Sequence, residues 1–256
     1  MARPADPHAR EALIVAARAE FARCGLRGAR IEDVTAACDL SKGAFYLHFP
    51  SKESLFGELV AAFNKEMEGC NRRRVRMMQE FRTRHGPVDR RDVETRSERY
   101  LRLLELEAEE DLRALESMWT FRDVLSVLLT GAQGTQFEGA IWKILERETA
   151  RVAADLDELR CHGAIRADIP KDIFASLVIG TWFLIGQRMI RMTEKPDLRS
   201  WAVWLQTLIR EGSAPGHEAA PAVQKKVVVR TRPSRLAAAR KGSKILQGSK
   251  KRRITP

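Results

Sequence analysis

Residues 31–49 read Ile31-Glu32-Asp33-Val34-Thr35-Ala36-Ala37-Cys38-Asp39-Leu40-Ser41-Lys42-Gly43-Ala44-Phe45-Tyr46-Leu47-His48-Phe49. The spacing of the apolar residues predicts two short helices, near 31–38 and 42–48. Ser41 suits the N-cap of the second helix, because its hydroxyl can accept a hydrogen bond from a backbone amide of the first turn. Phe45 and Phe49 lie four residues apart in that helix, so they share one face and we expect it to be buried. Two short helices joined by a tight turn form the layout of a helix-turn-helix.

The second of these helices opens with residues that are polar or very small, namely Lys42, Gly43 and Ala44. Small side chains at this position let a helix approach the floor of the major groove of DNA closely. The segment is therefore typical of a helix that reads duplex DNA.

Amphipathic segments flank the helix-turn-helix on both sides. A helix is predicted over residues 7–24, where Asp6 and Pro7 suit a helix start and Gly25 suits a helix end. A longer helix is predicted after Pro50-Ser51. Apolar residues recur at helical spacing in both, at Leu13, Ile14, Ala17 and Phe21 in the first and at Leu55, Leu59, Phe63 and Met67 in the second. The N-terminal region is therefore predicted to be a three-helix domain.

Residues 92–211 read as further amphipathic helices, and strand-like alternation is nearly absent, so we expect an all-α protein. The segment 172–193 is apolar nearly all round and must be covered on most sides. The next segment, 197–211, begins at a good cap, Asp197. The acidic residues of 105–116 are expected to form a solvated helix face.

The charge is concentrated at the C-terminal end. The 256 residues include 45 Lys+Arg and 34 Asp+Glu, for a net charge of +11. No acidic residue follows Glu218, whereas residues 221–256 hold 12 Lys and Arg. Such a segment cannot neutralise itself and suits a polyanion, so we expect a disordered basic tail over 213–256. A solvated tail without a defined partner is nearly as good an interpretation.

Several classes of protein are disfavoured. The longest apolar run, Leu177 to Gly186, is shorter than the roughly 20 residues of a membrane span. No secretory signal pattern opens the chain, and the four cysteines lack metal-ligand spacing. Nucleophile-elbow and phosphate-loop motifs are not found in the sequence. We therefore expect a cytoplasmic protein that is not an enzyme, does not enter membranes and holds neither a metal nor a cofactor.

One family matches these motifs in order and spacing. The stretch Phe21-x-x-x-Gly25, Ile31-x-x-Val34 and Leu40-Ser41-Lys42-Gly43-Ala44-Phe45-Tyr46-x-His48-Phe49-Pro50-Ser51-Lys52-Glu53-x-Leu55 resembles the N-terminal domain of tetracycline-repressor (TetR) family regulators over residues 8–63. The resemblance implies a DNA-binding domain over 1–54 and an effector-binding and dimerisation domain over 55–212. In the second domain only helical content and length fit.

The resemblance also assigns contacts to double-stranded DNA. Lys42, Gly43 and Ala44 would face base edges, whereas the polar side chains would contact phosphates, which fixes register. The full expected set is Arg30, Ser41, Lys42, Gly43, Ala44, Tyr46, His48 and Lys52. Tyr46 and His48 could instead simply cover the domain surface. Two departures from the family pattern stand out, because Arg30 occupies a usual Thr or Ser cap and Asp39 replaces a turn glycine.

Two further surfaces follow from the resemblance. A dimer interface is expected from helices 172–193 and 197–211, through Leu177, Gly180, Leu184, Trp201, Trp204, Leu205 and Leu208; the alternative is an intramolecular core. A pocket for a small apolar or aromatic effector is expected from Met118, Trp119, Phe121, Leu125, Phe137, Ile141, Trp142 and Trp182. Each of these is equally well read as ordinary packed core.

The leading hypothesis is a homodimeric, ligand-responsive transcriptional regulator, expected to be a repressor, that binds a palindromic operator. The alternative is a general or architectural nucleic-acid-binding protein in which the basic tail dominates. An enzyme has little support.

Overall fold

The computed structural model describes residues 7–214, and within that range every regular element is helical. The elements in chain order are α1 (Pro7–Gly28), α2 (Ile31–Ala36), α3 (Lys42–His48), α4 (Lys52–His85), α5 (Arg90–Thr95), α6 (Glu98–Thr120), α7 (Arg122–Ser126), the π-helix η1 (Val127–Gly131), α8 (Ala140–Cys161), α9 (Lys171–Ile190) and α10 (Leu198–Ser213). The expected all-α fold is confirmed for these residues. Nearly all of the basic tail, 215–256, lies outside them.

Local sequence signals set the boundaries of the first four helices. Ser41 caps α3 by accepting from the backbone N–H of Ala44 at 3.1 Å, and Ser51 caps α4 in the same way. Gly25 has a φ of 73° and kinks α1 near its end. Asp39 adopts a φ of 54° in the turn before α3, a conformation that Asp tolerates better than most residues.

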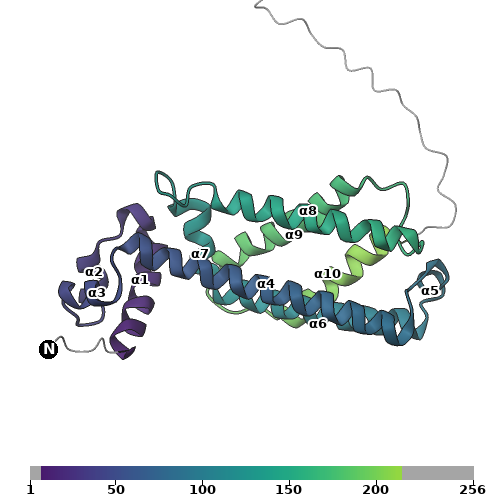
Figure 1. The fold of residues 1–256 in the computed structure, drawn as a ribbon, viewed down its shortest axis with the longest axis horizontal. Helices are drawn as coiled ribbons and strands as arrows, with labels where there is room; N and C mark the ends of the chain where they lie inside the picture. The colour runs from purple at the N-terminus through teal and green to yellow at the C-terminus, as the bar shows by residue number, and fades with distance from the viewer. Residues whose placement is uncertain (1–6, 215–256) are drawn as a thin grey trace, which may run out of the picture. The chain divides into compact units, whose positions relative to one another are not determined.

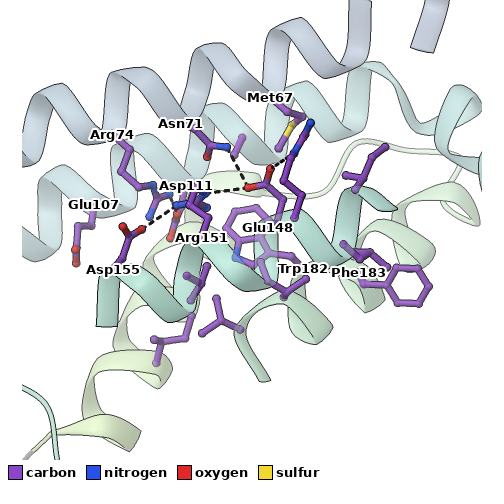
Figure 2. Close-up of a pocket in the computed structure, with 18 of the residues that line it drawn as sticks. Met67, Asn71, Arg74, Glu107, Asp111, Glu148, Arg151, Asp155, Trp182 and Phe183 are labelled. Carbon is purple, nitrogen blue, oxygen red and sulfur yellow. Dashed lines mark hydrogen bonds and ion pairs between the residues drawn. The ribbon is translucent and has the colours of Figure 1, made fainter. Parts of the chain in front are cut away.

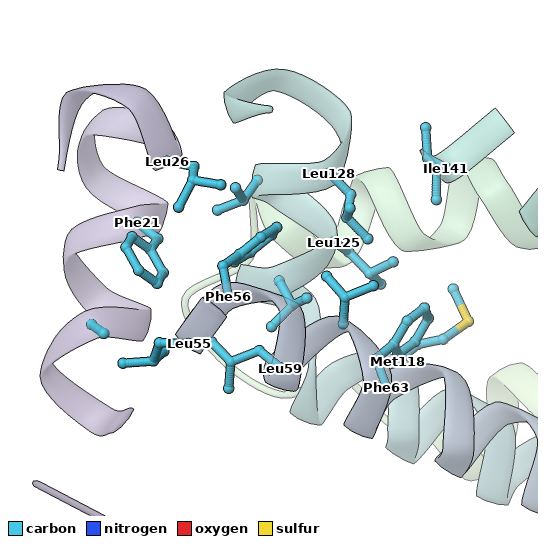
Figure 3. Packing of buried hydrophobic residues seen from close by; sticks show 14 of the residues in the cluster. Phe21, Leu26, Leu55, Phe56, Leu59, Phe63, Met118, Leu125, Leu128 and Ile141 are labelled. Atoms are coloured by element: carbon cyan, nitrogen blue, oxygen red, sulfur yellow. The ribbon is translucent and has the colours of Figure 1, made fainter. Parts of the chain in front are cut away.

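A continuous hydrophobic core joins α1–α3 to the following helices. Phe45 and Phe49 are fully buried in it, as predicted. Phe56 of α4 packs edge-to-face on Phe21 of α1 at 5.6 Å between ring centroids. Figure 3 shows the core continuing along α4 to Phe63 and then to Leu125 of α7. The expected boundary between residues 54 and 55 falls in the first turn of α4, a 34-residue helix that belongs to both regions.

The remaining helices pack as pairs beside α4. Figure 1 shows α6 alongside α4, with α10 on α6 and α8 on α9. A second, smaller core lies where α4 and α6 are joined through α5, around Phe81, Val93 and Tyr100. Asp89 and Asp92 form a reciprocal capping box at the start of α5, which fixes the chain direction there.

The acidic segment of α6 is only partly a solvated face. Glu105, Glu109 and Glu116 are exposed, as expected, but for the other three acidic residues the expectation is wrong. Glu107, Glu110 and Asp111 are each at most 5% exposed. Asp111 pairs with Arg74 of α4, and Glu107 pairs with Arg210 of α10. Because α6 lies between α4 and α10, basic residues far away in the sequence neutralise these carboxylates. That arrangement leaves no signal in the local pattern.

Candidate DNA-binding surface and internal cavity

The N-termini of α2, α3 and α4 come together at one surface. Lys42, the first residue of α3, forms an ion pair with Glu32 in the first turn of α2, at 2.6 Å. Lys52, the first residue of α4, donates from Nζ to the carbonyl oxygen of Ala29, just before α2, at 2.7 Å. The free N–H groups and partial positive charge of helix N-termini favour phosphate oxygens. The expected DNA contacts from Arg30 to Lys52 thus share one continuous region.

The leading turn of α3 is open. A Cβ atom on Gly43 would meet only the Ser41 hydroxyl, at 3.6 Å, among the residues that the structure describes. The Glu32 carboxylate raises the pKa of Lys42 by accepting its hydrogen bond. Glu32 uses one of the three N–H donors of Lys42. The exposed ion pair can also open at little cost when Lys42 turns toward a base or a phosphate.

The later turn of α3 presents polar side chains around the buried phenylalanines. Tyr46 is half exposed, and its ring packs edge-on against the ring of Phe45, with 5.6 Å between the ring centroids. Its hydroxyl has no partner within the described chain and can donate outward. His48 is partly exposed beside Phe49.

Two of the expected contacts have a different or additional role. Lys52 donates to the carbonyl oxygens of both Arg27 and Ala29, so it ties the end of α1 to the start of α4. An ammonium has three N–H donors, and only the third remains for a phosphate. Arg30 is exposed at the N-cap of α2 and makes no capping hydrogen bond.

An internal cavity of about 380 Å³ lies among α4, α6, α7, α8, α9 and α10. Four of the eight residues expected in a pocket line it, namely Met118, Leu125, Ile141 and Trp182. Its volume lies within the usual range for small-molecule sites, which runs from about 300 to 1,000 Å³.

The other four expected pocket residues lie outside this cavity. Trp119 lies under the guanidinium of Arg122, and Phe121 packs against Phe63. Phe137 packs on Phe56, and Trp142 is 63% exposed beside the ring of Phe183. These four extend the core or the surface instead, because helical spacing identifies apolar faces but not which neighbour covers them.

The cavity also has a polar wall that the sequence did not indicate. Figure 2 shows Asn71 and Arg74 of α4 near Glu148, Arg151 and Asp155 of α8. Glu148 accepts from Arg151 Nε at 2.9 Å and from Asn71 at 3.1 Å. Burial raises the pKa of the Glu148 carboxyl, but the hydrogen bond and charge of Arg151 outweigh it, and the pKa is lowered overall.

A short contact region links the cavity to the N-terminal helices. Arg18 of α1 binds both carboxylate oxygens of Asp123 of α7, at 2.6 and 2.7 Å. Backbone atoms of Gly25 in α1 lie so close to Gly131 of η1 that a Cβ atom on Gly131 would approach to 2.9 Å. Leu125 of α7, two residues after Asp123, lines the cavity. A shift of α7 on ligand binding would therefore reach α1 directly.

The outer faces of α9 and α10 are apolar, and no other part of residues 7–214 covers them. Four expected dimer residues are more than 60% exposed: Leu177, Leu184, Trp204 and Leu208. Gly180 has no neighbouring atom within 4 Å of a built Cβ. Trp201 is partly buried, and Leu205, at 7% exposure, packs in the core of its own chain instead. On length and composition alone α9 could also cross a membrane, a test that core helices pass too.

Comparisons with known proteins agree with this description. Residues 13–59 match the family model described as bacterial regulatory proteins, tetR family. Over 48 residues the chain is 38% identical to the HTH-type transcriptional repressor DhaR of Mycobacterium sp. (strain GP1), a match covering 19% of this chain and 24% of that repressor. The chain therefore spans about a quarter of the length of this curated relative.

Two solved structures extend the likeness to the whole described fold. The ketosteroid transcriptional regulator KstR2 of Mycobacterium tuberculosis matches with a TM-score of 0.60 and 17% identity, over 81% of this chain and 95% of that chain. A TetR-family transcriptional regulator from Bordetella parapertussis 12822 matches with a TM-score of 0.52 and 21% identity, over 80% and 95%. At these identities the likeness shows a shared fold.

Proposed function

We propose that this chain, whose residues 13–59 match the family model of bacterial regulatory proteins of the tetR family, is a ligand-responsive repressor of that family that binds a palindromic operator as a homodimer. The observation that carries the proposal is the convergence of the N-termini of α2, α3 and α4 around an open leading turn of α3. The centre of that surface carries only small side chains, so it can approach a duplex groove closely. Its rim is rich in N–H donors, which can bind phosphate oxygens.

The roles of the surface residues follow from their positions. Gly43 and Ala44 let the backbone of α3 approach base edges, and Lys42 supplies a donor once it leaves Glu32. Ser41, Tyr46 and His48 contact phosphates and fix the register of α3 on the duplex. Arg30 and the remaining N–H of Lys52 extend the phosphate contacts to the neighbouring helix N-termini.

The homodimer is supported by the uncovered faces of α9 and α10. A single helix-turn-helix reads too few bases to select one site in a genome, whereas a dimer reads two half-sites. Leu177 and Leu184 on α9, together with Trp204 and Leu208 on α10, supply exposed apolar area of the kind that interfaces bury.

Control by a small molecule is supported by the contact between the cavity and α1. In this mechanism an effector binds one arrangement of α7 more tightly, and the Arg18–Asp123 pair and the Gly25–Gly131 approach carry the shift of α7 to α1. The spacing of the two α3 helices in the dimer then no longer matches the operator. The differential affinity of the effector for the two states sets the extent of release.

Gel-shift titration with two lengths of the protein tests this proposal against general nucleic-acid binding by the basic tail. Full-length protein and a 1–214 truncation are titrated on a mixture of random duplexes. We expect the truncation to retain sequence-selective binding and to lose mainly the salt-dependent, non-selective component. Loss of all binding on truncation, with no preferred sequence in either form, would contradict the proposal and favour the alternative.

A further inference from the structure

The cavity has two chemically different parts. Around α7 its wall is formed by apolar side chains, among them Phe63, Met118, Leu125 and Trp182. Between α4 and α8 the wall carries charged and amide groups instead. A ligand that fills both parts must therefore be amphipathic, and the hydrogen-bonding state of the polar wall decides what its head group can be.

The carboxylates of the polar wall are already engaged. Asp111 accepts from Arg74 on one oxygen and from Gln206 on the other. Glu148 accepts from Asn71 and Arg151 on Oε2 and from Arg147 on Oε1, the last at 3.3 Å. These two side chains are also enclosed, with exposures of 1% and 17%. Asp155 is different, because it is 60% exposed and accepts from Arg151 on Oδ2. Among these three carboxylates, a cationic ligand would therefore find its open acceptor at Asp155, and not at Asp111 or Glu148.

The guanidinium groups of the same wall retain unused donors. Arg74 uses only Nη2, in its bond to Asp111. Arg151 uses Nε toward Glu148 and Nη1 toward Asp155, and its Nη2 makes no hydrogen bond to the side chains that the structure describes. Each guanidinium carries five N–H donors. Arg74 and Arg151, at 28% and 33% exposure, are more accessible than Asp111 and Glu148, the enclosed carboxylates that they bind. Beside these two carboxylates, a head group therefore finds N–H donors that are more open than the acceptors.

We propose that this cavity binds an amphipathic monocarboxylic acid, with its apolar body against Trp182 and Met118 and its carboxylate on the unused donors of Arg74 and Arg151. The inference rests on the proposed function, in which the cavity is the effector site. Arginines and carboxylates nearly balance around the polar wall, so selectivity comes from direct hydrogen bonds and not from long-range attraction. Guanidinium–carboxylate bonds are charge-assisted and stronger than those to a neutral hydroxyl.

Calorimetric titration of the full-length protein with matched ligands tests the proposal. Decanoate, decan-1-ol and decylammonium share one tail and differ only in the head group, and 4-cyclohexylbutanoate supplies a ring-bearing acid. The variants are Arg151→Gln, which removes the positive charge and the guanidinium group, and Arg151→Lys, which keeps the charge but not the planar guanidinium. Lys143→Gln is the matched control, since Lys143 is an exposed base of α8 outside the cavity.

We expect a carboxylate to bind at least tenfold more tightly than the alcohol and the ammonium. Arg151→Gln should weaken carboxylate binding by tenfold or more, Arg151→Lys by less, and neither should change alcohol binding. Lys143→Gln should behave as the parent protein. The proposal is overturned if neither acid binds, if the alcohol matches the acid, or if Arg151→Gln weakens both equally.

Operator release is measured separately, so that two failures can be distinguished. If the carboxylate binds with the expected dependence on Arg151 but leaves the DNA complex intact, the ligand class stands and ligand control of DNA binding fails. If DNA binding is selective but no carboxylate preference is found, the ligand class fails and the regulator remains.

Discussion

Tyr46 has the simplest environment of the expected DNA contacts. Its ring packs against buried Phe45, and the residue is half exposed. Tyr46→Phe therefore removes a donor and leaves the packing unchanged. Hydrogen bonds to charged groups contribute about 1.5 to 3 kcal/mol, so we expect operator affinity to fall by roughly 10- to 100-fold. Arg72→Gln, an exposed substitution on α4, is the control in the same gel-shift titration. Equal affinities for Tyr46→Phe and the parent would remove Tyr46 from the interface.

The ionised carboxylate of Asp92 is expected to contribute to the free energy of unfolding, and this contribution is lost at acidic pH. Burial disfavours its charge, but hydrogen bonds from Arg99, Ser97 and the Asp89 backbone dominate and lower its pKa from 3.8 to about 2. Because the folded pKa is depressed, the ionised carboxylate stabilises the fold above pH 4, and that stabilisation disappears as the pH falls toward 2. It amounts to at most about 2 kcal/mol.

Urea unfolding between pH 2 and 7 measures this contribution. Asp92→Asn should be less stable than the parent at pH 7, and the difference should shrink below pH 4. Glu105→Gln, an exposed change on α6, should show no comparable trend. A stability difference between Asp92→Asn and the parent that stays constant with pH would show that Asp92 acts through packing alone.

At the residue scale the sequence was informative wherever the cause is local. The caps Ser41 and Ser51, the kink at Gly25 and the unusual turn at Asp39 depend on neighbours within four residues. The carbonyl contacts of Lys52 could not be predicted in this way, because their partners lie 23 and 25 residues away.

Among the elements, α7 contacts both the cavity, through Leu125, and the N-terminal helix α1, through Asp123. Arg18 binds Asp123 through two hydrogen bonds at a partly buried site, and both side chains are less than a third exposed. A double-mutant cycle with Arg18→Ala and Asp123→Ala should give a coupling energy of about 1 to 3 kcal/mol in urea unfolding.

The ion pair between Arg23 and Glu20 offers a matched control within α1. It also has two hydrogen bonds, but its residues are three apart on one helix and Arg23 is 66% exposed. Its cycle should give less than about 0.5 kcal/mol. If the Arg18–Asp123 coupling is no larger than this, α1 and α7 are not held together as proposed.

Helix periodicity identified the long elements and the two short helices α2 and α3, but it missed the short elements α5, α7 and η1. The helices predicted at 172–193 and 197–211 correspond closely to α9 and α10. The sequence pattern did not predict the π-helix η1 or the buried carboxylates of α6, because both depend on tertiary contacts. In η1 Gly131 packs against Gly25, and in α6 Asp111 pairs with Arg74. The cavity also depends on tertiary contacts, and for this reason half of the residues expected to line it lie elsewhere.

At the scale of the whole molecule, we propose that the face formed by α9 and α10 is the dimer interface. Leu184 is 62% exposed on α9, so Leu184→Glu should leave the protomer folded and place a charge in the proposed dimer interface. We expect the dimer dissociation constant to rise more than tenfold in sedimentation equilibrium. Leu101→Gln on α6, another exposed leucine, is the control. Leu205 is unsuitable for this test, because its truncation would open a cavity in the core.

A change in dissociation constant that is the same for Leu184→Glu and Leu101→Gln would place the dimer interface elsewhere. The sequence pattern predicted which helices have apolar faces, but it could not divide those faces between core and interface. Only the fold separates Leu205, which is buried, from Leu208, which is exposed one turn later.

Selection of bound fragments from a pool of random duplexes, using full-length protein at near-physiological salt, tests most directly whether α3 reads DNA in a symmetric pair. We predict an enriched inverted repeat whose half-site centres lie about one turn of the DNA duplex apart, or a multiple of it. An unenriched pool, or a single asymmetric element, would contradict it.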